Sequence, residues 1–376
     1  MAKNILIITS DSFSLINFRG VLIKRLIDCG HRVTALLPQE KYNTNNIIQK
    51  LIKMKVSIKS YSLARAGLNI FQDYLSYKSI YSIISQCKPD VVIAYTAKPV
   101  IYSGMAMKHF PKISFFPLIT GLGYTFTEGK GIKRRLIRQL MVILYRKGLK
   151  NAQKLIFQNS DDKEFFRKLK ILPRKIPIHI VNGSGVDLDV YPFTPIPKKP
   201  IFLMLARLLI DKGVREYEEA ARIVKNRFPE AIFQLAGSLD SNPSSISPKE
   251  LKFWIKEGFI EYLGQITSVQ KILASCRFYV LPSYREGTPR SILEALATGR
   301  PIITTDVAGC RETVRHGKNG LLVACKNSKS LADAMLRLLQ EKENKIQSMG
   351  KASFILAKKK YDVKKVNKKL MSILNL

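Results

Sequence analysis

The stretch Arg285-Glu-Gly-Thr-Pro-Arg-Ser-Ile-Leu-Glu-Ala295 (REGTPRSILEA) predicts a turn that leads into a helix, and it carries two carboxylates. Thr288 is a good N-cap residue, and Pro289 suits a first helical position, where its missing N–H goes unused. We therefore predict a helix that begins here and ends near residues 298–299. The N–H groups of its first turn would bind an anion, and Gly287 would let a diphosphate come close.

Glu286 and Glu294 lie on either side of this helix start. Glu294 follows the predicted cap by nearly two turns, about 9 Å along the axis at about 1.5 Å per residue. Carboxylates accept paired hydrogen bonds from vicinal hydroxyls. One nucleotide-sugar would satisfy all of these groups, with its diphosphate at the helix and its sugar and ribose at the two carboxylates. The alternative is a pair of ordinary surface carboxylates.

A second cluster of charge follows an expected strand, residues 201–205. The loop after this strand contains Arg207 and Lys212, five positions apart, and ends at Gly213. Loops after the strands of a parallel sheet lie at its ligand-binding edge, so both cations would neutralise a departing diphosphate. The alternative is a pair of solvated surface charges.

Short apolar runs rich in β-branched residues alternate with helix-length segments along the chain. Such runs are typical of parallel sheets that helices cover on both faces. We therefore predict an α/β fold with doubly wound sheets. The expected strands are residues 5–9, 33–37, 91–94, 115–119, 155–157, 201–205, 232–236, 278–281, 302–304 and 321–323.

A segment with four prolines, residues 191–200, separates the two halves. Prolines cannot continue a helix or lie inside a sheet, and a chain of 376 residues suits two domains, so we place the linker here. We predict two Rossmann-like domains, 1–190 and 191–376, with the last helix able to pack back on the first domain. The carboxyl ends of both sheets would face a cleft between the domains, where such folds bind ligands.

The net charge of +35 and the pI near 10.0 predict a surface that attracts phosphate esters, nucleic acid or acidic lipid. The excess of basic residues is spread over both halves, which argues against a detachable nucleic-acid-binding tail. A nucleic-acid-binding protein is the alternative function that the charge suggests. The sequence has no helix-turn-helix signal, zinc-ligand pattern or RNA-binding aromatic motif, so we expect no nucleic-acid partner.

The cysteines and histidines indicate neither a disulfide framework nor a metal site. The five cysteines form no C-x-x-C pair, and the four histidines do not cluster. No apolar stretch approaches the ~20 residues that cross a bilayer, and the first run is too short for a signal peptide. We expect a cytoplasmic protein that is soluble or held at a membrane surface.

The two charged clusters and the residues that follow them resemble the retaining family 4 glycosyltransferases, which have the two-domain GT-B fold. The resemblance covers residues 200–325 well and the first half more loosely. Its motifs are Arg207-x-x-x-x-Lys212-Gly213, Glu286-Gly287, Glu294-Ala295, Gly299-x-Pro301, Gly309-Cys-Arg-Glu312 and Asn319-Gly-Leu-Leu322.

This resemblance implies a role for each matching residue. Glu286 would contact the hydroxyls of the donor sugar and Glu294 the ribose, while Arg207 and Lys212 would bind the diphosphate. It also implies a UDP-sugar donor, no metal and no other cofactor, and front-side attack in which the departing phosphate helps to deprotonate the acceptor. Further donor contacts would come from Gly185, Gly287, Thr288 and Pro289.

The first half departs from the family pattern. Its first loop, 10–19, lacks the usual glycine pair, and the run Tyr95-Thr-Ala-Lys-Pro99 stands where the family has a histidine. With residues 119–124, this run resembles a branch that adds N-acetylhexosamines to polyprenyl-diphosphate-linked glycans. Lys98 would stabilise negative charge as a catalytic residue or hold an acceptor phosphate, and the alternative is a solvated lysine. The implied acceptor-binding residues are Ser12, Phe13, Lys98, Thr120, Gly121 and Gly123.

The segment 129–154 contains nine Lys or Arg and no acid. An apolar stripe recurs in it at helical spacing: Ile132, Leu136, Leu140, Ile143 and Leu144. A basic helix with such a stripe can lie on an anionic bilayer, each cation contributing about 1 kcal/mol. The alternative is that the stripe packs on the domain core and the cations are only solvated. The predicted membrane contacts are Lys133, Arg134, Arg135 and Arg138.

Together these features predict an enzyme that transfers a sugar from a UDP-sugar to a saccharide on a polyprenyl diphosphate. The resemblance to the branch that extends polyprenyl-diphosphate-linked glycans implies that this sugar is an N-acetylhexosamine. Domain 1–190 would bind the acceptor and domain 191–376 the nucleotide-sugar. The enzyme would be retaining and metal-independent and would work at the cytoplasmic face of the inner membrane. A GT-B sugar-nucleotide hydrolase or epimerase is the alternative with the same fold.

Overall fold

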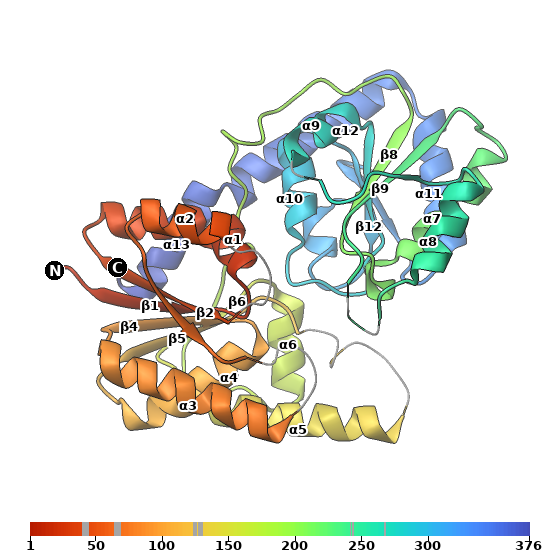
Figure 1. Ribbon diagram of the computed structural model, residues 1–376. Coiled ribbons are helices and arrows are strands. Elements are labelled where there is room, and N and C mark those ends of the chain that lie inside the picture. The colour runs from red at the N-terminus through yellow and green to blue at the C-terminus, as the bar shows by residue number, and fades with distance from the viewer. Residues whose placement is uncertain are drawn as a thin grey trace. The chain divides into compact units, whose positions relative to one another are not determined.

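The computed structural model describes the chain except residues 40–44, 64–68, 123–125, 127–130, 241, 243 and 267 and the side chain of Lys133. The chain forms two compact units (Figure 1). The first unit consists of Met1–Ser184 and Asn367–Leu376, and the second consists of Gly185–Val366.

A seven-stranded parallel sheet forms the centre of the first unit. Its order is β3 (Ser57–Tyr61), β2 (Arg32–Pro38), β1 (Asn4–Ile8), β4 (Val91–Tyr95), β5 (Ser114–Ile119), β6 (Leu155–Phe157) and β7 (Ile178–Ile180). Successive strand residues point to opposite faces, so Leu6 and Ile8 lie in one core cluster and Ile5 and Ile7 in the other.

Helices cover both faces of this sheet (Figure 1). Side chains of α1 (Ser12–Asp28), α2 (Asn45–Lys53) and α13 (Val363–Leu374) pack in the cluster with Ile5. The cluster with Leu6 contains side chains of α3 (Ile70–Cys87), α4 (Ala97–Ala106), α5 (Ile132–Leu149) and α6 (Ser160–Lys168). Side-chain caps help to fix where the helices begin. The carboxylate of Asp11 accepts a hydrogen bond from the amide of Ser14 at 2.6 Å and caps the N-terminus of α1.

A six-stranded parallel sheet forms the centre of the second unit. Its order is β10 (Glu261–Tyr262), β9 (Ile232–Ala236), β8 (Ile201–Leu205), β11 (Phe278–Leu281), β12 (Ile302–Thr305) and β13 (Gly320–Val323). The helices are α7 (Val214–Lys225), α8 (Pro248–Lys256), α9 (Val269–Ser275), α10 (Arg290–Ala297), α11 (Ser328–Gln340) and α12 (Glu343–Leu356).

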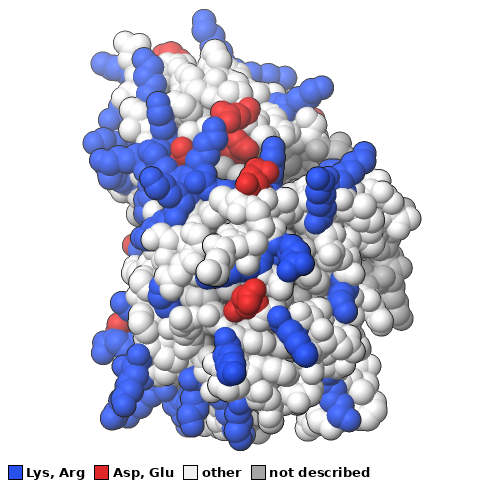
Figure 2. All heavy atoms as spheres, turned by 90° about the vertical axis from the view of Figure 1, so that its left-hand side faces the viewer, with Lys and Arg blue, Asp and Glu red and all other residues white. Residues whose placement is uncertain are grey.

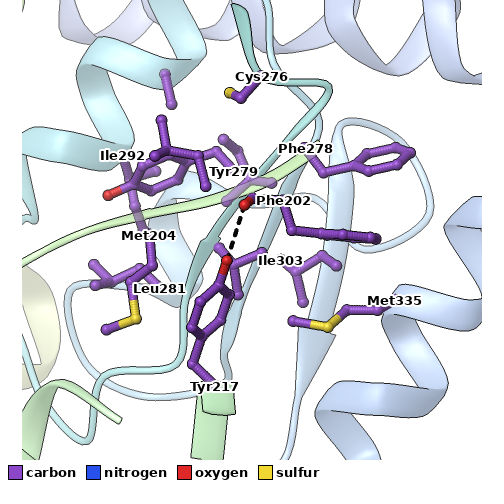
Figure 3. Packing of buried hydrophobic residues seen from close by; sticks show 14 of the residues in the cluster. Phe202, Met204, Tyr217, Cys276, Phe278, Tyr279, Leu281, Ile292, Ile303 and Met335 are labelled. Atoms are coloured by element: carbon purple, nitrogen blue, oxygen red, sulfur yellow. Dashed lines mark hydrogen bonds between the residues drawn. The ribbon is translucent and has the colours of Figure 1, made fainter. Parts of the chain in front are cut away.

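The core of the second unit is rich in aromatic side chains (Figure 3). The ring of Phe202 stacks on those of Phe233 and Phe278, with centroids 5.1 and 4.8 Å apart. The buried Tyr217 hydroxyl donates to the carbonyl of Phe202 at 2.9 Å, so its polar atom is satisfied inside the core. This packing holds β8, β9 and β11 together and fixes where their carboxyl ends lie.

The predicted fold class, an α/β chain with two doubly wound parallel sheets, is confirmed. All ten predicted strands are present, each within one residue of its expected ends. The structure adds β3, β7 and β10, each at an edge of its sheet. These three strands are short or interrupted by polar residues, so they lack the continuous apolar run on which the predictions depended.

The second unit begins at Gly185, six residues before the expected boundary at Tyr191. The amide of Val186 donates to the carbonyl of Tyr361 at 2.7 Å, and the amide of Val363 donates back to Val186 at 2.9 Å. These backbone bonds join residues 185–190 to the second unit.

The proline-rich segment also packs on the second unit. The side chain of Arg300 is fully buried and donates to the carbonyls of Thr194 and Pro195 at 2.6 and 3.0 Å. Burial lowers the pKa of Arg300, and the carbonyl oxygens around it compensate for its lost hydration. Residues 191–200 are therefore anchored to the second unit.

The surface is strongly basic. Figure 2 shows one face on which Lys and Arg are widely scattered and Asp and Glu are few. In the described part of the chain, no helix is both long and apolar enough to cross a membrane.

Candidate functional site

Three loops meet at the carboxyl edge of the second sheet. They follow β8, β11 and β12, which are neighbours in that sheet. The amide of Tyr284 donates to the carbonyl of Asp211 at 2.9 Å, and the amide of Glu286 donates to that of Ala308 at 3.1 Å. Backbone bonds therefore hold the loop that carries Glu286 between the other two.

Two glycines allow this close approach. A Cβ at Gly213 would lie 2.2 Å from the carbonyl oxygen of Pro282, and one at Gly309 would lie 2.3 Å from that of Glu286. Both glycines also have a positive φ, at 77° and 79°. Any other residue here would have to push the loops apart and would strain the backbone. Glycine is therefore required at both positions to keep the loops in contact.

Lys212 and Glu286 form an ion pair, with Nζ and Oε1 2.5 Å apart. Their side chains are only 20% and 14% exposed. The structure thus brings together one member of each charged cluster that the sequence singled out, and neither side chain is an ordinary surface charge. A ligand with both a diphosphate and hydroxyl groups would offer each partner a new contact.

Arg207 lies in the same loop but has a different partner. Its guanidinium donates to Asp240 at 2.8 Å, and its side chain is 55% exposed. Sequence reasoning missed Asp240, although it follows β9 and so lies at the same edge of the sheet. Arg207 is the more solvated of the two predicted diphosphate ligands.

The prediction that Thr288 caps α10 is wrong. The N-cap is Pro289, which has an extended ψ of 114° and makes no side-chain cap, and the helix begins at Arg290. The hydroxyl of Thr288 donates instead to the carbonyl of Gly287 at 2.9 Å. Because Pro289 itself has an extended ψ, it stands outside the helix and takes the cap position that was predicted for Thr288. The helix ends at Ala297, close to the predicted end.

Glu294 is held by a network that sequence reasoning missed. Nε of Arg290 donates to its carboxylate at 2.9 Å, and the hydroxyl of Tyr191 bonds to the same group. The Arg290 side chain also donates to the carbonyl of Gly185 at 2.6 Å. The i,i+4 spacing of Arg290 and Glu294 was the signal in the sequence for this pair. The network brings two predicted donor-binding residues, Glu294 and Gly185, to one guanidinium.

Burial raises the pKa of Glu294, and the charge of Arg290 and the hydroxyl of Tyr191 oppose this effect. We predict that Arg290→Met raises the pKa of Glu294 further. Ribose hydroxyls would donate to the ionised carboxylate, and protonation of Glu294 would remove this acceptor. As the pH falls, donor binding should therefore begin to weaken at a higher pH in the variant than in the wild type. At neutral pH we expect about a tenfold higher KM for the donor.

Donor KM measured against pH tests this prediction. Arg215→Met is the matched control, because Arg215 pairs with Glu250 on the surface of the same unit. Identical pH profiles for Arg290→Met and the wild type would show that Arg290 does not act through Glu294.

In the first unit, Lys98 pairs with Asp73 of α3, with Nζ and Oδ1 2.7 Å apart. The two side chains are 13% and 14% exposed, so the interpretation of Lys98 as a solvated lysine is wrong. Thr96, two residues earlier, has a φ of 70°, which is strained for a β-branched residue. Its buried hydroxyl has no hydrogen-bond partner among the described atoms. Sequence reasoning did not identify Asp73 as the partner of Lys98, although it singled out the run that contains Thr96.

The other predicted acceptor residues follow strands of the first sheet. Ser12 is buried and Phe13 is 60% exposed at the start of α1, just after β1. Thr120 and Gly121 are half-buried and follow β5. Since β1, β4 and β5 are neighbours, these residues and Lys98 lie along one carboxyl edge. Gly123 lies outside the described residues.

Helix α5 exposes the apolar stripe predicted from the sequence. Ile132, Leu136, Leu140 and Ile143 are 82%, 60%, 39% and 48% exposed. A different row, Ile137, Met141, Tyr145 and Leu149, packs on the core together with Leu144. The alternative that the stripe packs on the core is therefore wrong for four of its five residues. Arg135 and Arg138 are exposed and Arg134 is half-buried, while the side chain of Lys133 is outside the described part.

The described residues contain no cluster of three His, Cys, Asp or Glu that could hold a metal ion. The charges that the structure gathers at the second sheet's edge include those of Lys212, Glu286, Arg207 and Asp240. Cations and acceptor oxygens at one edge suit a ligand that carries both phosphate and hydroxyl groups.

Known families match both units. Residues 6–159 match the model described as Glycosyl transferase 4-like, and residues 199–341 match Glycosyl transferases group 1. The N,N'-diacetylbacillosaminyl-diphospho-undecaprenol alpha-1,3-N-acetylgalactosaminyltransferase of Campylobacter jejuni is 33% identical over 347 residues, 88% of each chain. The UDP-Gal:alpha-D-GlcNAc-diphosphoundecaprenol alpha-1,3-galactosyltransferase of Escherichia coli is 25% identical over 83% of this chain and 84% of its own.

Solved structures with this fold include Anabaena HepE in complex with UDP, with a TM-score of 0.76 at 16% identity over 99% of both chains. Sucrose-phosphate synthase from Thermosynechococcus elongatus has a TM-score of 0.79 at 15% identity, over 99% of this chain and 98% of its own. Likeness at this level of identity shows the fold, and it confirms the predicted GT-B class.

Proposed function

Because the chain belongs to the family 4 (group 1) glycosyltransferases, we propose that it transfers an N-acetylhexosamine from a UDP-sugar to a saccharide on a polyprenyl diphosphate. The Lys212–Glu286 ion pair at the sheet edge carries this proposal, since a cation suited to phosphate and a carboxylate suited to hydroxyl groups lie side by side there. The names of the Campylobacter and Escherichia relatives support the acceptor class, and the second also names a UDP-sugar. We choose an N-acetylhexosamine as the transferred sugar because the name of the Campylobacter relative includes N-acetylgalactosamine.

The donor would bind to the second unit. Lys212 and Arg207 would neutralise the leaving diphosphate together with the N-terminus of α10, where Gly287, Thr288 and Pro289 lie. Glu286 would accept hydrogen bonds from the hydroxyls of the sugar, and Glu294 from those of the ribose.

Transfer would retain the anomeric configuration and would use these side-chain cations in place of a metal. The bond between the anomeric carbon and the diphosphate oxygen breaks, and the acceptor oxygen bonds to the same face of the sugar. The departing diphosphate takes the acceptor's proton. In the first unit, Lys98 would bind the phosphate of the acceptor, and Asp73 would hold Lys98 in place.

A thermal-shift comparison of UDP, GDP and ADP, followed by turnover of UDP-sugars, tests the proposal. We expect UDP at about 100 times its dissociation constant to add about 2.7 kcal/mol to the free energy of unfolding, and the other two to add less. Sugar should leave the donor only when a polyprenyl-diphosphate-linked saccharide is present. Preference for GDP would contradict the donor assignment, and sugar release without acceptor would indicate a hydrolase.

The membrane contact belongs to the same proposal. Helix α5 would lie on an anionic surface at the cytoplasmic face of the inner membrane, with Arg134, Arg135 and Arg138 at the lipid headgroups. The exposure of its apolar stripe supports this orientation. If added salt did not weaken binding to phosphatidylglycerol vesicles at all, this result would contradict an electrostatic contact by α5.

A further inference from the structure

The first two turns of α3 carry four large apolar side chains that are exposed. Ile70, Phe71, Tyr74 and Leu75 have 85%, 70%, 51% and 39% of their surfaces exposed. Their spacing places them on one face of the helix, here called the α3 row. Single exposed apolar residues are common, but a contiguous row of large ones is typical of a contact surface.

Another face of the same two turns is tied to the candidate acceptor residue. Asp73 pairs with Lys98 at 2.7 Å, and both side chains are largely buried. The hydroxyl of Ser76 is also turned inward and donates to the carbonyl of Gln72 at 2.9 Å. These contacts fix the rotation of α3 about its axis, so the α3 row must face away from the core beside the site proposed for the acceptor phosphate.

The α3 row and the exposed stripe of α5 begin at the same edge of the first sheet. Both helices pack on α4 and lie on the same face of the sheet (Figure 1). Each connects the carboxyl end of one parallel strand to the amino end of another, so each starts at the carboxyl edge. The most exposed side chains, Ile70 in α3 and Ile132 in α5, stand in the first turns of these helices.

We propose that the α3 row inserts into the interfacial layer of a lipid bilayer, and that α3 and α5 form a two-helix contact at the point where the acceptor enters. This inference rests on the proposed function, in which the acceptor is lipid-linked. Charge complementarity favours an anionic bilayer, because Arg135 and Arg138 are exposed on α5. Phenylalanine and tyrosine suit the boundary between headgroups and hydrocarbon. The ammonium of Lys78 lies 5.3 Å from the centre of the Tyr74 ring and would reach the headgroups from the edge of the row.

Vesicle binding separates insertion from electrostatic attraction. In about 0.5 M salt, where the Debye length is about 4 Å, we expect the wild type to keep binding to phosphatidylglycerol vesicles. The double variant Ile70→Ser/Phe71→Ser should bind at least about tenfold more weakly under these conditions. Arg135→Gln/Arg138→Gln should instead lose the part of binding that salt removes. The matched control, Ile223→Ser/Ile355→Ser, changes two exposed isoleucines of the second unit and should bind like the wild type.

A fluorescent reporter tests the same contact without loss of apolar surface. Phe71→Trp should shift its emission to shorter wavelength when vesicles are added, whereas the natural Trp254 is 4% exposed and should contribute a constant signal. Equal binding of Ile70→Ser/Phe71→Ser and the wild type in high salt, or an unshifted Phe71→Trp emission, would overturn the proposal. Self-association that disappears in the serine variant would overturn it as well, because the α3 row would then bind a second copy of the chain.

These measurements use neither donor nor acceptor, so their failure is distinct from failure of the proposed function. Turnover of a water-soluble acceptor with a short lipid should be the same in Ile70→Ser/Phe71→Ser and the wild type. If both proteins fail to transfer sugar, the proposed function is wrong, whatever the vesicles show.

Discussion

Glu286→Gln is expected to lower kcat/KM for the UDP-sugar about a thousandfold, equivalent to about 4 kcal/mol of transition-state stabilisation. The substitution preserves the shape of the side chain but removes its charge. It leaves an amide beside Lys212, whose ammonium now lies 2.5 Å from the carboxylate. The sugar hydroxyls would lose a charged acceptor, and Lys212 would lose the partner that positions it. Steady-state kinetics with a saturating acceptor measure the effect.

Glu257→Gln provides the control for this substitution. Glu257 is exposed at the end of α8, so the same chemical change there should leave turnover unaltered. The two variants should unfold at temperatures close to that of the wild type. Turnover of Glu286→Gln within about threefold of the wild type would remove Glu286 from the proposed mechanism.

Lys212→Ala is expected to reduce kcat by a factor of about one hundred to one thousand, because the leaving diphosphate would lose its least solvated cation. UDP inhibition separates its role from that of Glu286. Lys212→Ala should weaken inhibition by UDP, since UDP contains the diphosphate. Glu286→Gln should weaken inhibition by UDP less than Lys212→Ala does, since UDP has no donor sugar and the ammonium of Lys212 is still present. Lys329→Ala, at the exposed start of α11, is the control for loss of a lysine.

The double variant Lys212→Ala/Glu286→Gln measures the coupling of the pair. Residues that act as a unit show effects smaller than the sum of the single losses. We expect the double variant to be little slower than the slower single variant. Losses that add fully would mean that the two side chains act independently in spite of their contact.

Much of the fold could be predicted because buried parallel strands have a recognisable composition. Central strands such as β8 and β11 are apolar along their whole length, and β1 is apolar after Asn4, so their ends were found within one residue. The site near Glu286 and Lys212 followed from one rule, that loops after parallel strands share an edge of the sheet. Strand β3 was missed because Ser57-Ile-Lys-Ser-Tyr61 pairs on one side only and three of its five residues are polar.

The partners of the charged residues could not be predicted, because they depend on how separate elements pack. Lys98 pairs with Asp73, which is 25 positions earlier on a different helix. Arg207 pairs with Asp240, which is 33 positions later. Local spacing contains no signal for such pairs unless the packing of the helices and loops is already known.

Helix α5 shows why periodicity alone was ambiguous, since two of its rows recur at helical spacing. The row that faces the core ends near Gly148, where a Cβ would lie 2.8 Å from the backbone of Ile101. A glycine lets α5 approach α4 closely at this position, and this close approach decides which row is buried. The other row, with Ile132, Leu136, Leu140 and Ile143, remains exposed.

The return of the last ten residues to the first unit affects how the protein is made. The side chains of Leu370, Met371, Ile373 and Leu374 complete a core whose other members lie in the first 181 residues. The ribosome therefore finishes the second unit before the first can close, although the first is synthesised earlier. Removal of the C-terminus, or a bulky fusion to it, would open the half of the enzyme that is proposed to receive the lipid-linked acceptor.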